Sequence, residues 1–402
     1  MRVVVLGAGV VGVTTAYYLS QLGCEVTVVD RANTVGDGAS FGNAGQLSYS
    51  FTDALAKPEF LAHIPALVLG RDAGSQVRLS PQLVAWGMRF VGQCTKKHAR
   101  ENTLAVLKIA LRSAELLAEM REKMPFDFWH RRAGKLVLLS TPAELDGAKA
   151  SVALKRAHGC DARLLSRSEA VSIEPTLEHV SEGISGAVYS GSDEVADSQK
   201  FTSGLRGWLE VNASVDFRLS SNASKLVARD GRTHAVVVDG DALEADAFVV
   251  CTGAWSHELL RTAGINPHVF PVRGYSITLP PGEAAPSVSM TALKYRMVYS
   301  RLNGLIRVAG FADFRGFDTS TDDIRTQLLL DLARRYAPLA ADYDVEDIKP
   351  WGGFRPMTPN GQPQVGPTRL KGLYVNTGHG MLGWTLACAT GYDAAQAITR
   401  VH

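Results

Sequence analysis

The first thirty residues carry a glycine pattern that determines how the chain begins to fold. An apolar strand over residues 2–6 runs into Gly7-Ala8-Gly9-Val10-Val11-Gly12, and a second strand over residues 25–29 ends at Asp30. In such βαβ units the first glycine allows a tight turn, the second lets the backbone approach a pyrophosphate, and the third lets the helix pack closely on the strand. The helix N-terminus offers free N–H groups to phosphates, and the terminal acid accepts hydrogen bonds from a ribose. The pattern therefore predicts a dinucleotide site.

Bulk properties exclude several other classes of protein. The 402 residues include 42 Lys and Arg against 40 Asp and Glu, a balance that gives no reason to expect a nucleic-acid partner. The five cysteines are widely spaced and form no CxxC pair, so we expect a reducing compartment, no disulfide framework and no metal site. We see no signal peptide and no apolar run of membrane-spanning length, which predicts a cytoplasmic protein.

The order of elements predicts two domains, one of them discontinuous. Both ends of the chain resemble pieces of a nucleotide-binding unit, while residues 51–125 have helical spacing and the strands after residue 269 are typical of an antiparallel sheet. The simplest topology is a βαβ domain interrupted by a sheet domain. We predict an α/β chain (α+β overall). The Rossmann-like cofactor domain is expected over residues 1–50, 196–268 and 350–402, and the mainly antiparallel substrate domain, with its helical insertion, over 51–195 and 269–349.

Three further features favour FAD over NAD. Residues 378–385 open the last helix, and this second helix N-terminus can stabilise the negative charge that a reduced flavin carries near N1 and C2=O. The small residues of the loop 39–46 would let backbone amides reach an isoalloxazine ring. Residues 252–255 end a strand where the chain of a flavoprotein returns to its cofactor.

At these residues the chain resembles the D-amino-acid oxidase superfamily of flavoproteins, nearly end to end, and most of all its bacterial D-amino-acid dehydrogenases. The most specific matches are residues 351–359 and 376–380. The other matching segments are 7–12, 40–46, 193–195 with Phe201, 271–276 and 306–310. The resemblance implies non-covalent FAD and the oxidation of an amine to an imine, which water hydrolyses to a 2-oxo acid and ammonia.

The residues expected to contact FAD come from the phosphate loop, the end of the second strand, the loop after it, the returning strand and the start of the last helix. They are Gly7, Gly9, Val10, Val11, Gly12, Asp30, Arg31, Ser40, Asn43, Ala44, Gly45, Gln46, Thr252, Gly253, Trp255, Gly353, Gly380, Met381, Leu382, Gly383 and Thr385.

Arg355 and Tyr275 are the candidates for binding the substrate. A guanidinium can hold a carboxylate with two parallel hydrogen bonds. In the superfamily the arginine of a Gly-Phe-Arg-Pro pattern does so, and residues 353–356 match that pattern; the alternative is a structural arginine that ties loops together. The Tyr275 hydroxyl could donate to the same carboxylate, or it could be buried and bonded to backbone. For His379 we favour a structural or flavin-edge role over that of a general base.

The partners follow from this interpretation. We expect a small amino-acid substrate and an electron acceptor such as a quinone, with oxidation of D-hydroxyproline or another cyclic secondary amine as the alternative reaction. A flavin-binding protein without turnover is a further alternative. The apolar segment 60–69 could touch a membrane surface, at the inner face of the plasma membrane, or it could cover the pocket.

Overall fold

The chain begins with the predicted βαβ unit. In the computed structural model, which describes residues 1–346 and 348–400, β1 (Arg2–Leu6) and β2 (Glu25–Val29) are parallel neighbours joined by α1 (Val10–Gln21). Gly7 adopts a φ of +110°, which only glycine adopts readily. A Cβ at Gly12 would lie 1.8 Å from the Gly7 carbonyl oxygen, so the helix rests directly on the turn.

The unit extends into a six-stranded, mostly parallel sheet. Its strands, in spatial order, are β18 (Gln364–Pro367), β19 (Leu373–Thr377), β12 (Ala247–Val250), β1, β2 and β8 (Val215–Arg218). Only the edge strand β18 is antiparallel to its neighbour. The sheet brings together strands from the beginning, middle and end of the chain, as the sequence predicted for a discontinuous domain.

Both faces of this sheet are covered. Val3 and Val5 belong to the core under α1, α7 (Ser198–Asn212) and α10 (Gly383–Thr399). Val4 and Leu6 face the opposite way, into a core shared with a small antiparallel sheet and α8 (Ser256–Arg261). This alternation is what a strand buried on both faces requires. The small sheet consists of β9 (Ala223–Arg229), β10 (Arg232–Val238) and β11 (Asp241–Glu244).

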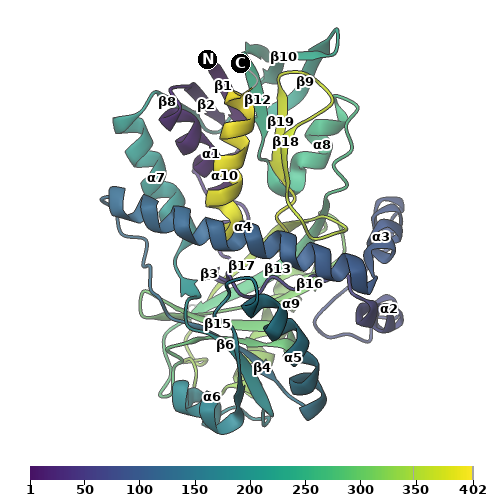
Figure 1. Ribbon diagram of the computed structural model, residues 1–402, viewed down its shortest axis with the longest axis vertical. Helices are drawn as coiled ribbons and strands as arrows, with labels where there is room; N and C mark the ends of the chain where they lie inside the picture. The colour runs from purple at the N-terminus through teal and green to yellow at the C-terminus, as the bar shows by residue number, and fades with distance from the viewer. Residues whose placement is uncertain (347, 401–402) are drawn as a thin grey trace.

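An eight-stranded sheet forms the other half of the molecule (Figure 1). Its spatial order is β17 (Lys349–Met357), β13 (Phe270–Leu279), β16 (Leu305–Asp313), β15 (Met297–Leu302), β14 (Ser289–Ala292), β4 (Lys135–Leu139), β6 (Gly186–Ser190) and β5 (Arg163–Ser166). All its pairings are antiparallel except that of β14 with β4. The helices on this half are α5 (Pro142–Arg156), α6 (Arg167–Ile173) and α9 (Asp322–Tyr336), with the short turns η2 (Pro175–Glu178) and η4 (Leu293–Tyr295).

The predicted helical insertion is present between the two halves. It consists of η1 (Pro58–His63), α2 (Ile64–Val68), α3 (Pro81–Gln93) and α4 (Lys96–Lys123). Figure 1 shows α4 crossing the molecule where the two halves meet, with α2 and α3 at one side. Short pieces complete the chain: β3 (Gln46–Leu47) pairs with β7 (Glu194–Val195), and η3 (Gly253–Trp255) precedes α8.

Two segments depart from the expected division of the chain. Residues 350–357 were assigned to the cofactor domain, but as β17 they pair with β13 in the eight-stranded sheet. The sequence pattern did not predict this strand because Gly352 and Gly353 have no side chains that would show the alternation of a strand. Large side chains of other residues occupy the space where their Cβ atoms would lie. Helix α4 was assigned to the substrate domain, but Val106, Ala110 and Leu117 pack in the core of the six-stranded sheet.

Candidate active site

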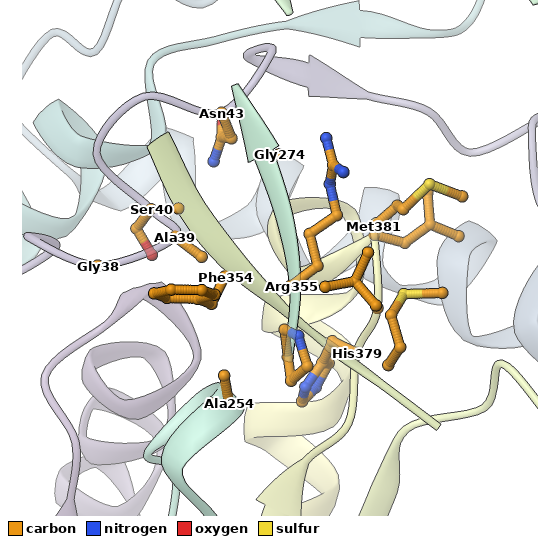
Figure 2. A pocket seen from close by; sticks show the side chains of 18 of the residues that line it. Gly38, Ala39, Ser40, Asn43, Ala254, Gly274, Phe354, Arg355, His379 and Met381 are labelled. Atoms are coloured by element: carbon orange, nitrogen blue, oxygen red, sulfur yellow. The ribbon is translucent and has the colours of Figure 1, made fainter. Parts of the chain in front are cut away.

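A cavity of about 1400 Å³ lies between the two sheets. Ligand pockets for drug-sized molecules are typically about 300–1,000 Å³, so this one has room for a large cofactor and a small second molecule. Figure 2 shows the side chains around it, from the loop that carries Ser40 and Asn43, from β17 with Arg355, and from the segment that carries His379 and Met381.

The N-terminus of α1 opens into the cavity. Gly9 is its N-cap, no side chain caps it, and its first turn contains no acidic residue. A Cβ at Gly9 would meet only the Ser40 hydroxyl, at 3.5 Å, so the space in front of the backbone is open. The Val10 N–H donates to Ser40 Oγ at 3.0 Å, which ties the loop 39–46 to the helix. Ser40 thus occupies one N–H of the first turn, and an N-terminus that otherwise opens into the cavity fits the pyrophosphate of a dinucleotide.

Asp30 and Arg31 line the next part of the cavity. Asp30 accepts hydrogen bonds from the Ala8 N–H at 2.6 Å and the Ala32 N–H at 2.8 Å, which orient its carboxylate. The Arg31 guanidinium stacks on the Trp255 ring at 4.0 Å. Since Trp255 follows β12, this stack joins the ends of two parallel strands.

A second helix N-terminus faces the same cavity. Leu382, the N-cap of α10, has no capping side chain, and the first turn of α10 again lacks an acidic residue. Gly380, Met381 and Gly383 line the cavity beside it. Two uncapped helix ends at one cavity, as the sequence analysis inferred, fit the two electron-rich parts of FAD, its pyrophosphate and its reduced ring.

Nineteen of the 21 residues named as cofactor contacts line this cavity; Gly12 and Thr385 do not. Gly12 is pressed against the Gly7 carbonyl and supports the turn from behind. Thr385 is buried, and its hydroxyl oxygen accepts a hydrogen bond from the Ser48 N–H at 3.0 Å. These two positions lie outside the lining of the cavity and contact segments that form it.

Arg355 presents its guanidinium to the cavity without a carboxylate partner. Its Nη1 donates to the Phe311 carbonyl oxygen at 2.6 Å, and the residues described include no ion pair to it within 4.0 Å. Burial lowers the pKa of Arg355 to about 10, so the group is charged at neutral pH. Arg355 is half-buried, and a cation withdrawn from water without a directly paired anion is unfavourable by itself, so the group is suited to bind an anion.

The Tyr275 hydroxyl is engaged elsewhere, which corrects its expected role. It donates to Asp313 Oδ2 at 3.0 Å, and Asp313 also accepts two hydrogen bonds from Arg325, at 2.9 and 2.8 Å. Burial and the Asp313 charge raise the pKa of Tyr275 above its usual range. Tyr275 is among the residues that line the cavity, but its side chain is buried in the core of the eight-stranded sheet, and donation to a ligand would require breaking a buried hydrogen bond.

His379 is a buried neutral histidine. Its Nε2 lies 3.0 Å from the Thr390 hydroxyl of α10, and burial lowers its pKa to about 3. The side chain is thus fixed against α10, and its ring stays neutral and takes up no second proton at neutral pH.

The burial of His379 predicts that acid destabilises the fold. An unfolded histidine has a pKa of about 6.5, so below that pH the unfolded state binds the proton and the folded state does not. The free energy of unfolding is therefore not affected by this group above about pH 6.5. Below that pH it falls by about 1.4 kcal/mol for each pH unit. Urea titrations at pH 4.5 to 7.5 should show a shallower dependence for His379→Asn than for the unchanged protein. Exposed His234→Asn is the control, and equal slopes in all three proteins would contradict the assignment.

Lys135, Arg273 and Phe311 also line the cavity but were not named from sequence. Arg273 is paired with Asp322, and Phe311 has a left-handed backbone with a φ of 63° that aims its carbonyl at Arg355. The signal for Lys135 and Arg273 is a charged residue in an otherwise largely apolar strand, since lysine and arginine are rarely buried without a partner.

Comparisons with known proteins agree with this geometry. The family model described as DAO, FAD dependent oxidoreductase, matches residues 2–397. The chain is 38% identical over 411 residues to D-amino acid dehydrogenase 2 of Ralstonia nicotianae, across 100% of this chain and 97% of that relative. It is 37% identical over 409 residues to D-amino acid dehydrogenase of Dechloromonas aromatica, across 99% of this chain and 97% of that relative.

Solved structures share the fold. Glycine oxidase from Geobacillus kaustophilus superposes with a TM-score of 0.76 at 22% identity, over 99% of this chain and 95% of that one. L-proline dehydrogenase from P. horikoshii gives 0.76 at 20% identity, over 100% and 93%. The chain therefore belongs to the DAO family of FAD dependent oxidoreductases.

Proposed function

We propose that the protein is an FAD-dependent dehydrogenase that converts a D-amino acid to a 2-oxo acid and ammonia. The observation that carries the proposal is the half-buried guanidinium of Arg355, which has no carboxylate partner among the described residues and faces a cavity into which two helix N-termini open. FAD supplies a two-electron acceptor at N5 of its ring. The D configuration rests on the D-amino acid dehydrogenases that are similar along the whole chain.

In this proposal, the described side chains bind the substrate in the following way. Arg355 takes the carboxylate with two of its N–H groups, while Nη1 is held by the Phe311 carbonyl. Behind it, Asp313 fixes Tyr275 and Arg325, so the wall on which the substrate rests is rigid. His379 remains neutral and leaves the deprotonation of the substrate ammonium to solvent.

Spectroscopy without oxygen tests this function. The purified protein should show flavin absorbance, and D-alanine or D-phenylalanine should bleach it whereas the L-enantiomers should not. Bleaching by D-hydroxyproline alone would favour the cyclic-amine alternative. A flavin that no amine reduces would leave a binding protein without turnover.

Gly274 provides a test at the substrate anchor. A Cβ at Gly274 would lie 2.3 Å from Cζ and Nη2 of Arg355, so Gly274→Ala should displace the guanidinium. We expect KM for the D-amino acid to rise about 10- to 100-fold, because a charge-assisted pair contributes about 1.5–3 kcal/mol. Steady-state kinetics measure the effect, and flavin content and Tm are the controls. An unchanged KM would show that Arg355 does not anchor the substrate.

We propose further that the electron acceptor is a quinone reached at a membrane surface. No helix within residues 1–346 and 348–400 is long and apolar enough to span a bilayer, so the contact would be peripheral. Its support is a group of exposed apolar side chains on the helical insertion, beside Phe60 and His63 of the cavity wall. These side chains are Leu61, Val68, Leu69, Val84, Met88 and Val91. The Phe60 ring packs on Phe90 at 5.1 Å, so η1 and α3 form one surface.

Vesicle sedimentation tests the membrane contact. The holoenzyme should sediment with anionic vesicles, and Leu69→Glu with Met88→Glu should reduce the bound fraction several-fold, because both side chains are more than 60% exposed and apolar. Val211→Glu is the matched control, since Val211 is 83% exposed but lies on α7. Absence of sedimentation, or an equal loss with Val211→Glu, would contradict the contact.

A further inference from the structure

Lys135 is a buried cation in the cavity wall that the proposed function does not yet use. It is the first residue of β4 and is only 3% exposed. The next residue, Leu136, and Leu138 belong to the core of the eight-stranded sheet. Since side chains alternate along a strand, Lys135 points the other way, and it lines the cavity.

Only neutral groups hold the Lys135 ammonium. Nζ donates to Gln46 Oε1 at 2.9 Å and to Ser48 Oγ at 2.7 Å, and it lies 4.4 Å from the centre of the Phe51 ring. The described residues include no carboxylate within 4.0 Å of it. Two of its three donors are thus used by neutral oxygens, and its charge is not neutralised by direct contact.

The nearest acids are committed to other partners. Asp53 is paired with Lys155, and Asp193 accepts hydrogen bonds from the N–H and hydroxyl of Ser50, at 3.0 and 2.8 Å. Asp193 and Asp53 attract the ammonium while Lys155 repels it, and burial, the largest effect, lowers the pKa of Lys135 to about 8. The group therefore remains charged at neutral pH.

The hydrogen bonds place Lys135 beside the second helix N-terminus. Gln46 begins the short strand β3 and Ser48 follows it, and the Ser48 N–H donates to Thr385 Oγ1 in the first turn of α10. This is the helix end assigned to the flavin ring. The ammonium and the α10 dipole thus present positive charge from two elements at one part of the cavity.

The substrate anchor lies at the other side of the sheet. Arg355 is on β17, and four strands separate β17 from β4. The path along the twisted sheet is therefore five inter-strand steps of about 4.8 Å, or at most about 24 Å. Lys135 therefore belongs to the cofactor side of the cavity rather than to the carboxylate site.

We propose that Lys135, held by Gln46 and Ser48 beside the N-terminus of α10, stabilises the negative charge that the bound flavin acquires on reduction. The ammonium favours the reduced cofactor, so it makes the enzyme a stronger oxidant of its substrate. This inference rests on FAD being the bound cofactor but not on the identity of the amino acid.

The reduction equilibrium of the bound flavin tests the role of Lys135 without any substrate. In the holoenzyme, Lys135→Met should lower the equilibrium constant for two-electron reduction about tenfold, which corresponds to about 30 mV. The dissociation constant for sulfite, which adds to the oxidised ring and leaves it negatively charged, should rise about tenfold. Lys135→Arg keeps the charge and should recover most of both values. Lys57→Met removes an exposed lysine from the same cavity wall and should change neither value more than threefold.

Several results would overturn the inference. An unchanged potential in Lys135→Met with FAD still bound would do so, as would an equal shift in Lys57→Met. A selective rise in KM for D-glutamate at unchanged potential would instead make Lys135 a site for the substrate side chain. If Lys135→Met does not fold, Lys135→Gln serves the same purpose, because its amide can still bond to Ser48. A failed substrate assignment would leave the potential and the sulfite affinity as predicted.

Discussion

Arg355→Ala should raise KM for the D-amino acid by about 10²–10³-fold while the flavin stays bound. Removing one partner of a buried charge pair costs about 3–5 kcal/mol, because the remaining charge is left without compensation. Here that charge is the substrate carboxylate, facing a cavity in which Arg355 is held ready by the Phe311 carbonyl. Steady-state kinetics measure KM, and the flavin spectrum reports that the site is otherwise intact.

Arg273→Ala is the matched control for Arg355→Ala. Both arginines line the cavity, but Arg273 is paired with Asp322 and lies 4.3 Å from the centre of the Phe354 ring. Because its charge is already compensated, we expect KM to change less than tenfold. A KM that moves less than threefold in Arg355→Ala, or further in Arg273→Ala, would remove Arg355 as the anchor. Arg355→Lys should recover only part of the loss, since an ammonium lacks the planar fork of a guanidinium.

The sequence predicted the parts of the site that depend on neighbours in the chain. The turn at Gly7, the open helix end at Gly9 and the acid Asp30 lie within one βαβ unit, whose geometry follows from local rules. Arg355 was named as a candidate because a short motif carries it. The strand around it was missed, because its Gly352 and Gly353 are covered by Arg273 and Trp351, and no local pattern shows this.

Contacts between distant segments could not be predicted. For the Tyr275 hydroxyl the sequence left a substrate carboxylate and the backbone as possible partners, whereas it bonds to Asp313, 38 residues away. The surroundings of Lys135 are set by Gln46 and Ser48, which are 89 and 87 residues away. In both cases the residue type allowed several partners, and only the pairing of distant strands decides among them.

Gly12→Ala is expected to have the largest effect on the cofactor site. The new Cβ would lie 1.8 Å from the Gly7 carbonyl oxygen and 2.9 Å from its carbon. Gly7 cannot move away, since a Cβ placed on it would already lie 2.6 Å from the Cys251 carbonyl. Helix α1 must therefore shift outward, and the N–H groups at its N-terminus shift with it. We expect a loss of about 3 kcal/mol in unfolding free energy, at the upper end for overpacking, and at least a 100-fold rise in the FAD dissociation constant.

Gly207→Ala separates this clash from the general effect of replacing a helical glycine. Gly207 lies within α7, which packs against α1, and a Cβ there would meet no atom within 4 Å. Alanine should stabilise that helix by about 0.5–1 kcal/mol and leave FAD affinity unchanged. Urea titration and flavin titration of both variants give the comparison. If Gly12→Ala bound FAD as tightly as Gly207→Ala, the close contact between α1 and the phosphate turn would not be what shapes the site, because only the first variant places a side chain between them.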